Sequence, residues 1–199
     1  MMLTEVTAVP AAALPVFQFR DHLRLGTGFT DTGLEDGLLE TYLRAAIAAV
    51  EAWTGKALIA RSFVYEASCW TGASAQALPV APVQEITALT LVDADGAETL
   101  LDAGRYGVVR DTHRPELAGK GALLPSIPTG GVARITLQAG FGASWTEVPA
   151  DLAHAVLLLA AYYHEYRYEA RMGAARIPYG VSSLISSWRP IRLGGRDVR

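Results

Sequence analysis

The sequence of 199 residues contains one cysteine, four histidines and no apolar run long enough to cross a bilayer. A lone cysteine, Cys69, excludes an internal disulfide, and no metal-ligand partner lies near it in the sequence. We expect a plain buried or half-buried thiol. The longest apolar stretch, Leu152 to Tyr163, is interrupted by His154 and spans about 18 Å as a helix, against a hydrocarbon core of about 30 Å. We therefore expect no transmembrane helix and no membrane partner.

The N-terminus lacks the basic flank and continuous apolar core of a secretion signal, so we expect the protein to stay in the cytoplasm of the cell that makes it. Positive charge is also scarce before residue 171, where eleven Lys and Arg face nineteen Asp and Glu. Residues 171–199 instead carry six arginines and one acid. An acidic body suits duplex DNA poorly, whereas a basic tail suits docking on an acidic surface.

Apolar residues are abundant. They make up 51% of the chain, charged residues make up only 19%, and the mean hydropathy is +0.22. A chain of this length supports one main domain, and its core does not need that much apolar surface. We expect the excess to be buried in a large interface between subunits.

The first part of the chain predicts an extended N-terminal arm over residues 1–18, a short helix at 16–23 and a main domain over 19–180. Thr32-Gly33-Leu34-Glu35 has the form of a capping box, and apolar residues follow at helical spacing. A helix is therefore predicted over 33–54, with Gly55 as its stop.

Residues 59–141 show short β-prone runs separated by turn residues, with a hairpin signal at Asp93-Ala94-Asp95-Gly96. The intervals are too short for crossover helices, so the strands should be antiparallel. The best strands are 61–69, 86–92, 105–110 and 133–141.

The last third returns to helix. Pro149 and Asp151 suit the first turn of a helix over 149–172. A short amphipathic helix follows with its apolar residues at i, i+3, i+4 and i+7, and the basic arm completes the segment 181–199. The predicted fold class is α+β: mainly an α-helical bundle with an inserted antiparallel β lobe and extended N- and C-terminal arms.

No catalytic, cofactor-binding or metal-binding residues are predicted. His164-Glu165 begins a zinc-protease pattern, but the second ligand position holds Tyr168. His154 and His164 lie ten residues apart, about 80° around a helix, and do not converge on one ion. A small hydrolase with dispersed Ser, His and Asp residues stays open as an alternative.

A group of aromatic residues on the long helix admits two interpretations. It could stack on single-stranded nucleic acid, but few basic residues are interleaved with it. We favour packing between subunits, through Tyr162, Tyr163 and Tyr166.

The order of short motifs resembles the head-to-tail connector (adaptor) family of long-tailed phages and phage-derived gene transfer agents. Each motif is weak alone, and their order and spacing from Phe19 to Arg192 carry the resemblance. They are Phe19-Arg20-Asp21-His22-Leu23-Arg24-Leu25, Val50-Glu51-Ala52-Trp53-Thr54-Gly55-Lys56-Ala57-Leu58-Ile59, Leu78-Pro79-Val80-Ala81-Pro82-Val83, Gln138-Ala139-Gly140-Phe141-Gly142, Val148-Pro149-Ala150-Asp151-Leu152, Ile177-Pro178-Tyr179-Gly180-Val181 and Trp188-Arg189.

The resemblance implies a structural subunit, not an enzyme. About twelve copies would form a ring at the neck of the particle, between the portal protein and the next neck or tail-completion protein. DNA would pass through the lumen without sequence-specific binding. A second alternative is a DNA-binding assembly factor that acts through the Arg-rich tail.

The C-terminal segment is the predicted portal contact. Its helix is too short to be stable alone, so it needs a surface to lie on. That surface is either the portal or the chain's own body, and we expect the portal. The predicted portal-contact residues are Val181, Leu184, Ile185, Trp188, Arg189, Arg192, Arg196 and Arg199.

Overall fold

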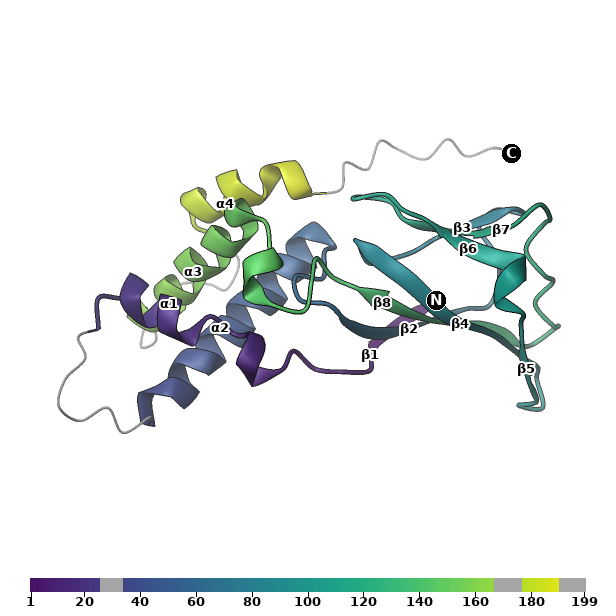
Figure 1. Ribbon diagram of the computed structural model, residues 1–199, viewed down its shortest axis with the longest axis horizontal. Coiled ribbons are helices and arrows are strands. Elements are labelled where there is room, and N and C mark those ends of the chain that lie inside the picture. Colours follow the sequence, from purple (N-terminus) through teal and green to yellow (C-terminus); the bar gives the residue numbers. More distant parts are fainter. Residues whose placement is uncertain (26–33, 167–176, 190–199) are drawn as a thin grey trace. The chain divides into compact units, whose positions relative to one another are not determined.

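The computed structural model describes residues 1–25, 34–166 and 177–189, and the chain divides into two compact units (Figure 1). The first, which we call the β unit, comprises residues 1–15 and 56–149. The second, the helical unit, comprises 16–55 and the residues from 150 onward. The β unit is therefore inserted between two helices of the other unit, with the first 15 residues added to it.

The β unit contains two antiparallel sheets. The five-stranded sheet has the order β1-β2-β8-β4-β5, and the three-stranded sheet has the order β3-β7-β6. Three 3-10 turns also belong to this unit: Ala11–Ala13, Ala103–Arg105 and Trp145–Glu147. The strands are β1 (Met2–Glu5), β2 (Arg61–Ala67), β3 (Ala75–Ala77), β4 (Val83–Val92), β5 (Glu98–Leu100), β6 (Tyr106–Val109), β7 (Glu116–Gly119) and β8 (Val132–Ala139).

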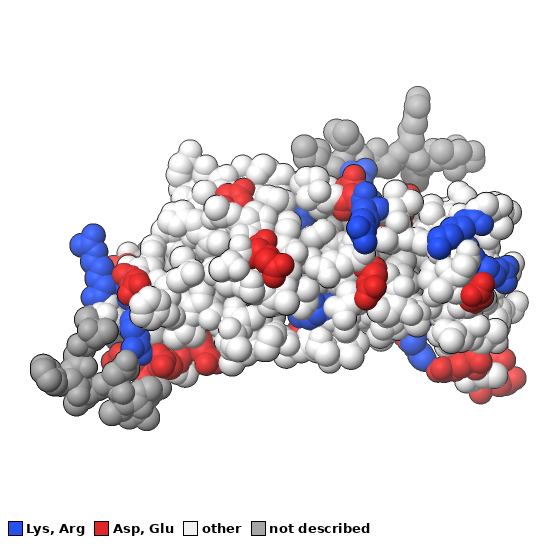
Figure 2. All heavy atoms as spheres, in the orientation of Figure 1, with Lys and Arg blue, Asp and Glu red and all other residues white. Residues whose placement is uncertain are grey.

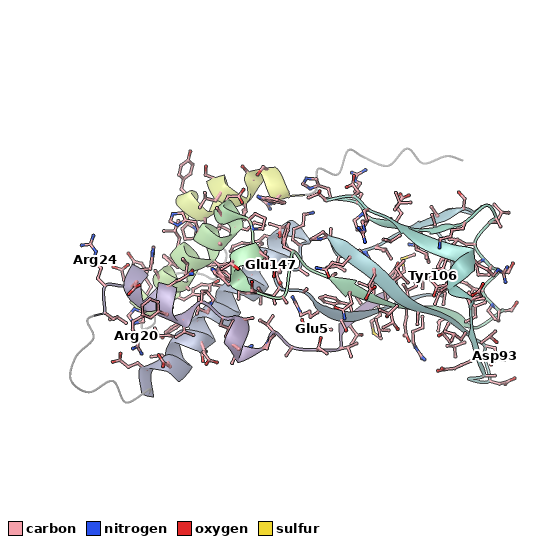
Figure 3. The ribbon with its side chains drawn as sticks, in the orientation of Figure 1. Glu5, Arg20, Arg24, Asp93, Tyr106 and Glu147 are labelled. Atoms are coloured by element: carbon pink, nitrogen blue, oxygen red, sulfur yellow. The ribbon has the colours of Figure 1, made fainter. Side chains whose placement is uncertain are left out.

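One hydrophobic core lies between the two sheets. Strands β2 and β8 alternate buried and half-buried residues, so one face of the large sheet points inward. Phe63, Ile135 and Leu137 lie on that face, and Leu117 and Tyr106 meet them from the small sheet. Tyr106 is labelled in Figure 3. The opposite face of the large sheet is polar and half-exposed, as a two-layer arrangement requires.

The helical unit contains α1 (Val16–His22), α2 (Leu34–Thr54), α3 (Ala150–Glu165) and α4 (Tyr179–Ile185), with a 3-10 turn at Ser186–Trp188. Helix α3 packs against the other three helices. Helix α2 ends where the sequence predicts, because Gly55 adopts φ +67° and its N–H donates to the carbonyl of Glu51. The core is formed by apolar side chains such as Phe19, Leu43 and Leu159.

The structure confirms an α+β fold with antiparallel sheets, and it corrects the expectation of a mainly helical bundle. The β unit is a two-sheet body with its own core, and it also takes in residues 1–15. The predicted N-terminal arm is not extended throughout, because β1 pairs with β2, which lies about 60 residues further along the chain. A pairing between such distant segments leaves no local pattern. The basic C-terminal arm, Thr32 of the capping box and the end of the helix predicted to reach residue 172 lie outside the described residues.

Candidate assembly surfaces

Helix α4 lies on the body of its own helical unit. Val181 and Ile185 are fully buried, and α4 packs against α3. Leu184 is half-buried, and Arg189 is exposed. The structure therefore assigns two of the predicted portal-contact residues to the core of this unit. Arg192, Arg196 and Arg199 lie outside the described residues.

Trp188 is fixed to the start of α3. Its indole Nε1–H donates to Oδ2 of Asp151 at 2.5 Å, and the ring is half-buried. A charge-assisted bond of this kind is stronger than one between neutral groups. Asp151 also accepts from the backbone N–H of Leu152 through Oδ1. The end of the 3-10 turn is thus held to the first turn of α3, and Trp188 keeps part of its ring on the surface.

The predicted subunit-interface tyrosines form a cluster at the end of α3. The rings of Tyr162 and Tyr166 lie 4.7 Å apart between centroids, and those of Tyr162 and Tyr163 lie 6.3 Å apart. All three are half-buried. Burial raises the pKa of the Tyr163 hydroxyl, with a smaller contribution from Tyr162. The cluster offers neutral aromatic surface, which suits packing against another protein.

The histidines do not converge on one site. His154 is exposed and meets His22 edge-on at 6.3 Å, whereas His164 meets Tyr42 at 5.7 Å. Within residues 1–25, 34–166 and 177–189, no three His, Cys, Asp or Glu side chains are placed to hold a metal ion. The expected burial of Cys69 is wrong, because this thiol is exposed. It follows a strand end where the chain turns at the edge of the β unit.

The serines of α4 are used within the helix. The hydroxyl of Ser182 donates to the carbonyl of Tyr179, and that of Ser186 donates to the carbonyl of Ser183. Local bonds of this type satisfy the hydroxyl without a general base. These two serines therefore show no arrangement of a nucleophile with its base.

Lys56 is the one fully buried lysine among the described residues of the β unit. Burial lowers the pKa of its ammonium group, and the negative charge of Asp111 opposes that effect. The pKa of Asp111 is itself lowered, first by the backbone N–H of Arg114 and then by that of His113. The pair provides charge balance beside a packed core.

A hollow of about 120 Å³ lies beside the β4–β5 hairpin, lined by Leu101, Arg105, Tyr106 and Lys120 among others. Ligand pockets of enzymes usually measure about 300–1,000 Å³. The hollow is too small for most substrates, and its two cations have no nucleophile or base beside them on the lining. We assign it no chemistry.

Charges of both signs are interspersed over the face in Figure 2. Two ion pairs organise the large sheet. Arg61, almost fully buried, pairs with Glu5 of β1 at 3.0 Å, and its guanidinium lies over the ring of Phe63. On the other face, Arg134 binds Glu66 and Glu98. No extended field of one sign appears on the face in Figure 2, so a single-sign surface for nucleic acid is not visible there.

Exposed apolar side chains mark surfaces that sequence reasoning missed. The described part of the chain has ten large ones, and four lie in the first six residues: Met1, Met2, Leu3 and Val6. Phe17 is 73% exposed and Tyr179 is 88% exposed. Helical spacing places Phe17 on α1 but does not say which face is covered. The four-residue strand β1 is too short for an alternation signal.

Among the described residues, no helix has the length and apolar character needed to span a membrane. No protein-family model matches the chain, and a search of the curated proteins found no match.

Solved structures, in contrast, match over almost the entire chain. One comes from the neck of an empty gene transfer agent particle computed with C6 symmetry, at 56% identity and a TM-score of 0.89. A second comes from the neck of a native particle computed with C12 symmetry, at 53% identity and a TM-score of 0.84. A third, from the virion of a native gene transfer agent particle, has 57% identity and a TM-score of 0.86.

Each match covers 98% of this chain and 100% of the other. Identity above half over the full length leaves the fold and the order of all motifs in common. The chain therefore belongs to the phage-type connector family of the particle neck, together with the neck proteins of gene transfer agents.

Proposed function

We propose that this chain is a structural subunit of the neck of a gene transfer agent or related phage particle, where its copies form a ring. One observation supports this most strongly: chains 53% and 56% identical to it come from particle necks computed with C12 and C6 symmetry. Rotational symmetry repeats one contact around an axis, and the contact joins two different faces of the subunit. Twelve copies agree with the higher of the two symmetries.

In more detail, we propose a head-to-tail connector. The portal protein lies on one side of the ring, and the next neck or tail-completion protein lies on the other. DNA passes through the lumen without sequence-specific binding. The acidic balance of the first 170 residues supports a conduit, because a net negative lumen repels passing DNA.

The role is structural and not enzymatic. The small-hydrolase alternative requires a nucleophile, a base and a stabilising group in one pocket. His154, His164 and the serines of α4 are instead separated or satisfied locally. The DNA-binding alternative depends on arginines beyond residue 189, and the matches to particle necks do not favour it.

Electron microscopy tests the proposal directly. A reconstruction of the particle neck should show this chain as a ring with about twelve copies around the channel. Negative-stain images of the purified protein, alone and mixed with its portal protein, should show that the ring docks on the portal. A single asymmetric copy at the neck would refute the proposed function.

A further inference from the structure

The large sheet of the β unit has two open edges. Strand β1 is one edge and strand β5 is the other, with β2, β8 and β4 between them (Figure 1). All residues of both edge strands are exposed. An open edge presents unpaired N–H and C=O groups, which readily pair with another strand.

The pairing register shows which groups are open on β1. The N–H of Val6 donates to the carbonyl of Ser62, so the even residues of this strand bond to β2. In an antiparallel pair, hydrogen-bonded positions alternate with open ones. The N–H and C=O groups of Leu3 and Glu5 therefore point away from the sheet.

The same reasoning applies to β5. The N–H of Leu101 donates to the carbonyl of Leu89, and the N–H of Asp93 accepts its bond from the carbonyl of Ala97. The odd residues of this segment thus bond to β4. The backbone groups of Glu98 and Leu100 point outward, and the Leu100 side chain is 70% exposed.

Proteins usually protect such edges, and β1 is not protected. Lysine, proline and β-bulges are the common protective features, and Met2–Glu5 has none of them. Its one charged residue, Glu5, is paired with Arg61. The apolar side chains Met2 and Leu3 stay exposed beside the open backbone. This combination is typical of a strand that meets a partner.

We propose that β1 of one copy pairs with β5 of the next copy, so that the large sheets join edge to edge around the ring. The proposal rests on the ring proposed above. A closed ring requires two different faces on each subunit, and one sheet with two open edges provides them. Because neighbouring strands in this sheet are antiparallel, β1 and β5 run in the same direction, and their contact would be a short parallel pairing.

Side chains are compatible with this contact. Glu98 and Leu100 lie on the polar face of the sheet, since Arg134 of that face binds Glu98. Met2 lies on the same face, because its cross-strand partner is Glu66, which binds Arg134 as well. Met2 can therefore cover Leu100. Glu5 lies on the inner face with Arg61 and does not meet Glu98.

The first test is a cross-link in assembled particles. Met2→Cys and Leu100→Cys are introduced together with Cys69→Ser, which removes the exposed natural thiol. Within one chain, four strand spacings separate β1 from β5, about 19 Å, so a short bis-maleimide cannot join them. We expect a ladder of covalent oligomers on a denaturing gel, and only monomers from either single-cysteine variant.

The second test removes an outward hydrogen-bond donor. Leu3→Pro leaves the bonds between β1 and β2 intact, and an edge residue whose N–H faces solvent tolerates proline. If the edge is paired, we expect about tenfold fewer heads joined to tails, because a buried carbonyl on the neighbour loses its partner. Leu3→Ala keeps the N–H and serves as the matched control, with a loss of no more than about threefold.

The outcomes separate the two proposals. A ring at the neck without a cross-link ladder, or with normal assembly of Leu3→Pro, would overturn the edge pairing and leave the proposed function in place. Absence of a ring in particles of the natural chain would overturn both. A ladder with loss of assembly in Leu3→Pro alone would support both.

Discussion

Deleting the C-terminal segment in two steps should separate stability from portal binding. The shorter deletion removes residues 190–199, and the longer one removes 179–199 and with them α4. The longer deletion takes away Val181 and Ile185, which are 1% and 0% exposed. It also uncovers the apolar face of α3 on which they lie.

The expected loss is large. Full burial of a Val or Ile side chain contributes about 1.5–3 kcal/mol, so the pair contributes about 3–6 kcal/mol. Domains are stable by only about 5–15 kcal/mol. For a unit of about 100 residues, 1 kcal/mol shifts the melting temperature by about 4–8 °C. We expect the longer deletion to lower the melting temperature by about 12 °C or more.

The assay is thermal unfolding followed by circular dichroism, combined with a pull-down on the portal protein at physiological salt. The chain without residues 190–199 should melt within about 3 °C of the full chain, because it keeps α4 and the Trp188–Asp151 bond. If the basic arm and Trp188 make the portal contact, this variant should bind portal more weakly. Trp188→Ala should weaken binding more than Arg189→Ala, because a partly exposed aromatic anchor contributes more than a rim arginine.

Two results would refute this reasoning. A chain without residues 179–199 that melts with the full chain would show that α4 does not stabilise the helical unit. Normal portal binding by the chain without residues 190–199, together with normal binding by Trp188→Ala, would show that the portal contact lies elsewhere.

Three further predictions follow from single residues. Gly37→Ala, inside α2 with open space around its Cα, should raise the free energy of unfolding by about 0.5–1 kcal/mol, whereas Gly55→Ala, at φ +67°, should lower it by about 1 kcal/mol; urea unfolding measures both, and changes of equal sign would contradict the assignment. The pKa of Lys56 is lower in the folded chain than its ordinary value of 10.5, so the unfolded chain binds more protons between those two values and stability should rise with pH in that window. Lys56→Met should lack this rise in urea titrations at successive pH values, and an identical profile would exclude Lys56 as its source. Replacing His154 or His164 with Asn should leave particle assembly within about twofold of the natural chain when joined heads and tails are counted, because neither belongs to a convergent site; a specific loss with the ring still present would indicate an unrecognised role.

Local patterns in the sequence determined the elements whose causes are local. Gly55 stops α2 because a residue without Cβ adopts positive φ there at low cost, and the Asp93–Gly96 turn joins β4 to β5 because its residues favour that conformation. Residues 61–67 and 132–139 form strands because β-prone residues follow one another between turns. The order of the short motifs further indicated the connector family, which the full-length matches to particle necks confirm.

Only the tertiary structure decided which surfaces are covered. The apolar stripe of α4 predicts that the helix lies on a surface, but periodicity cannot say whether that surface is the portal or the chain's own α3. The pairing of Met2–Glu5 with β2 joins segments about 60 residues apart, and the exposure of Cys69 depends on where the chain turns after that strand. Such contacts depend on the packing of distant segments, whose energy is shared among many residues and leaves no mark at any single one.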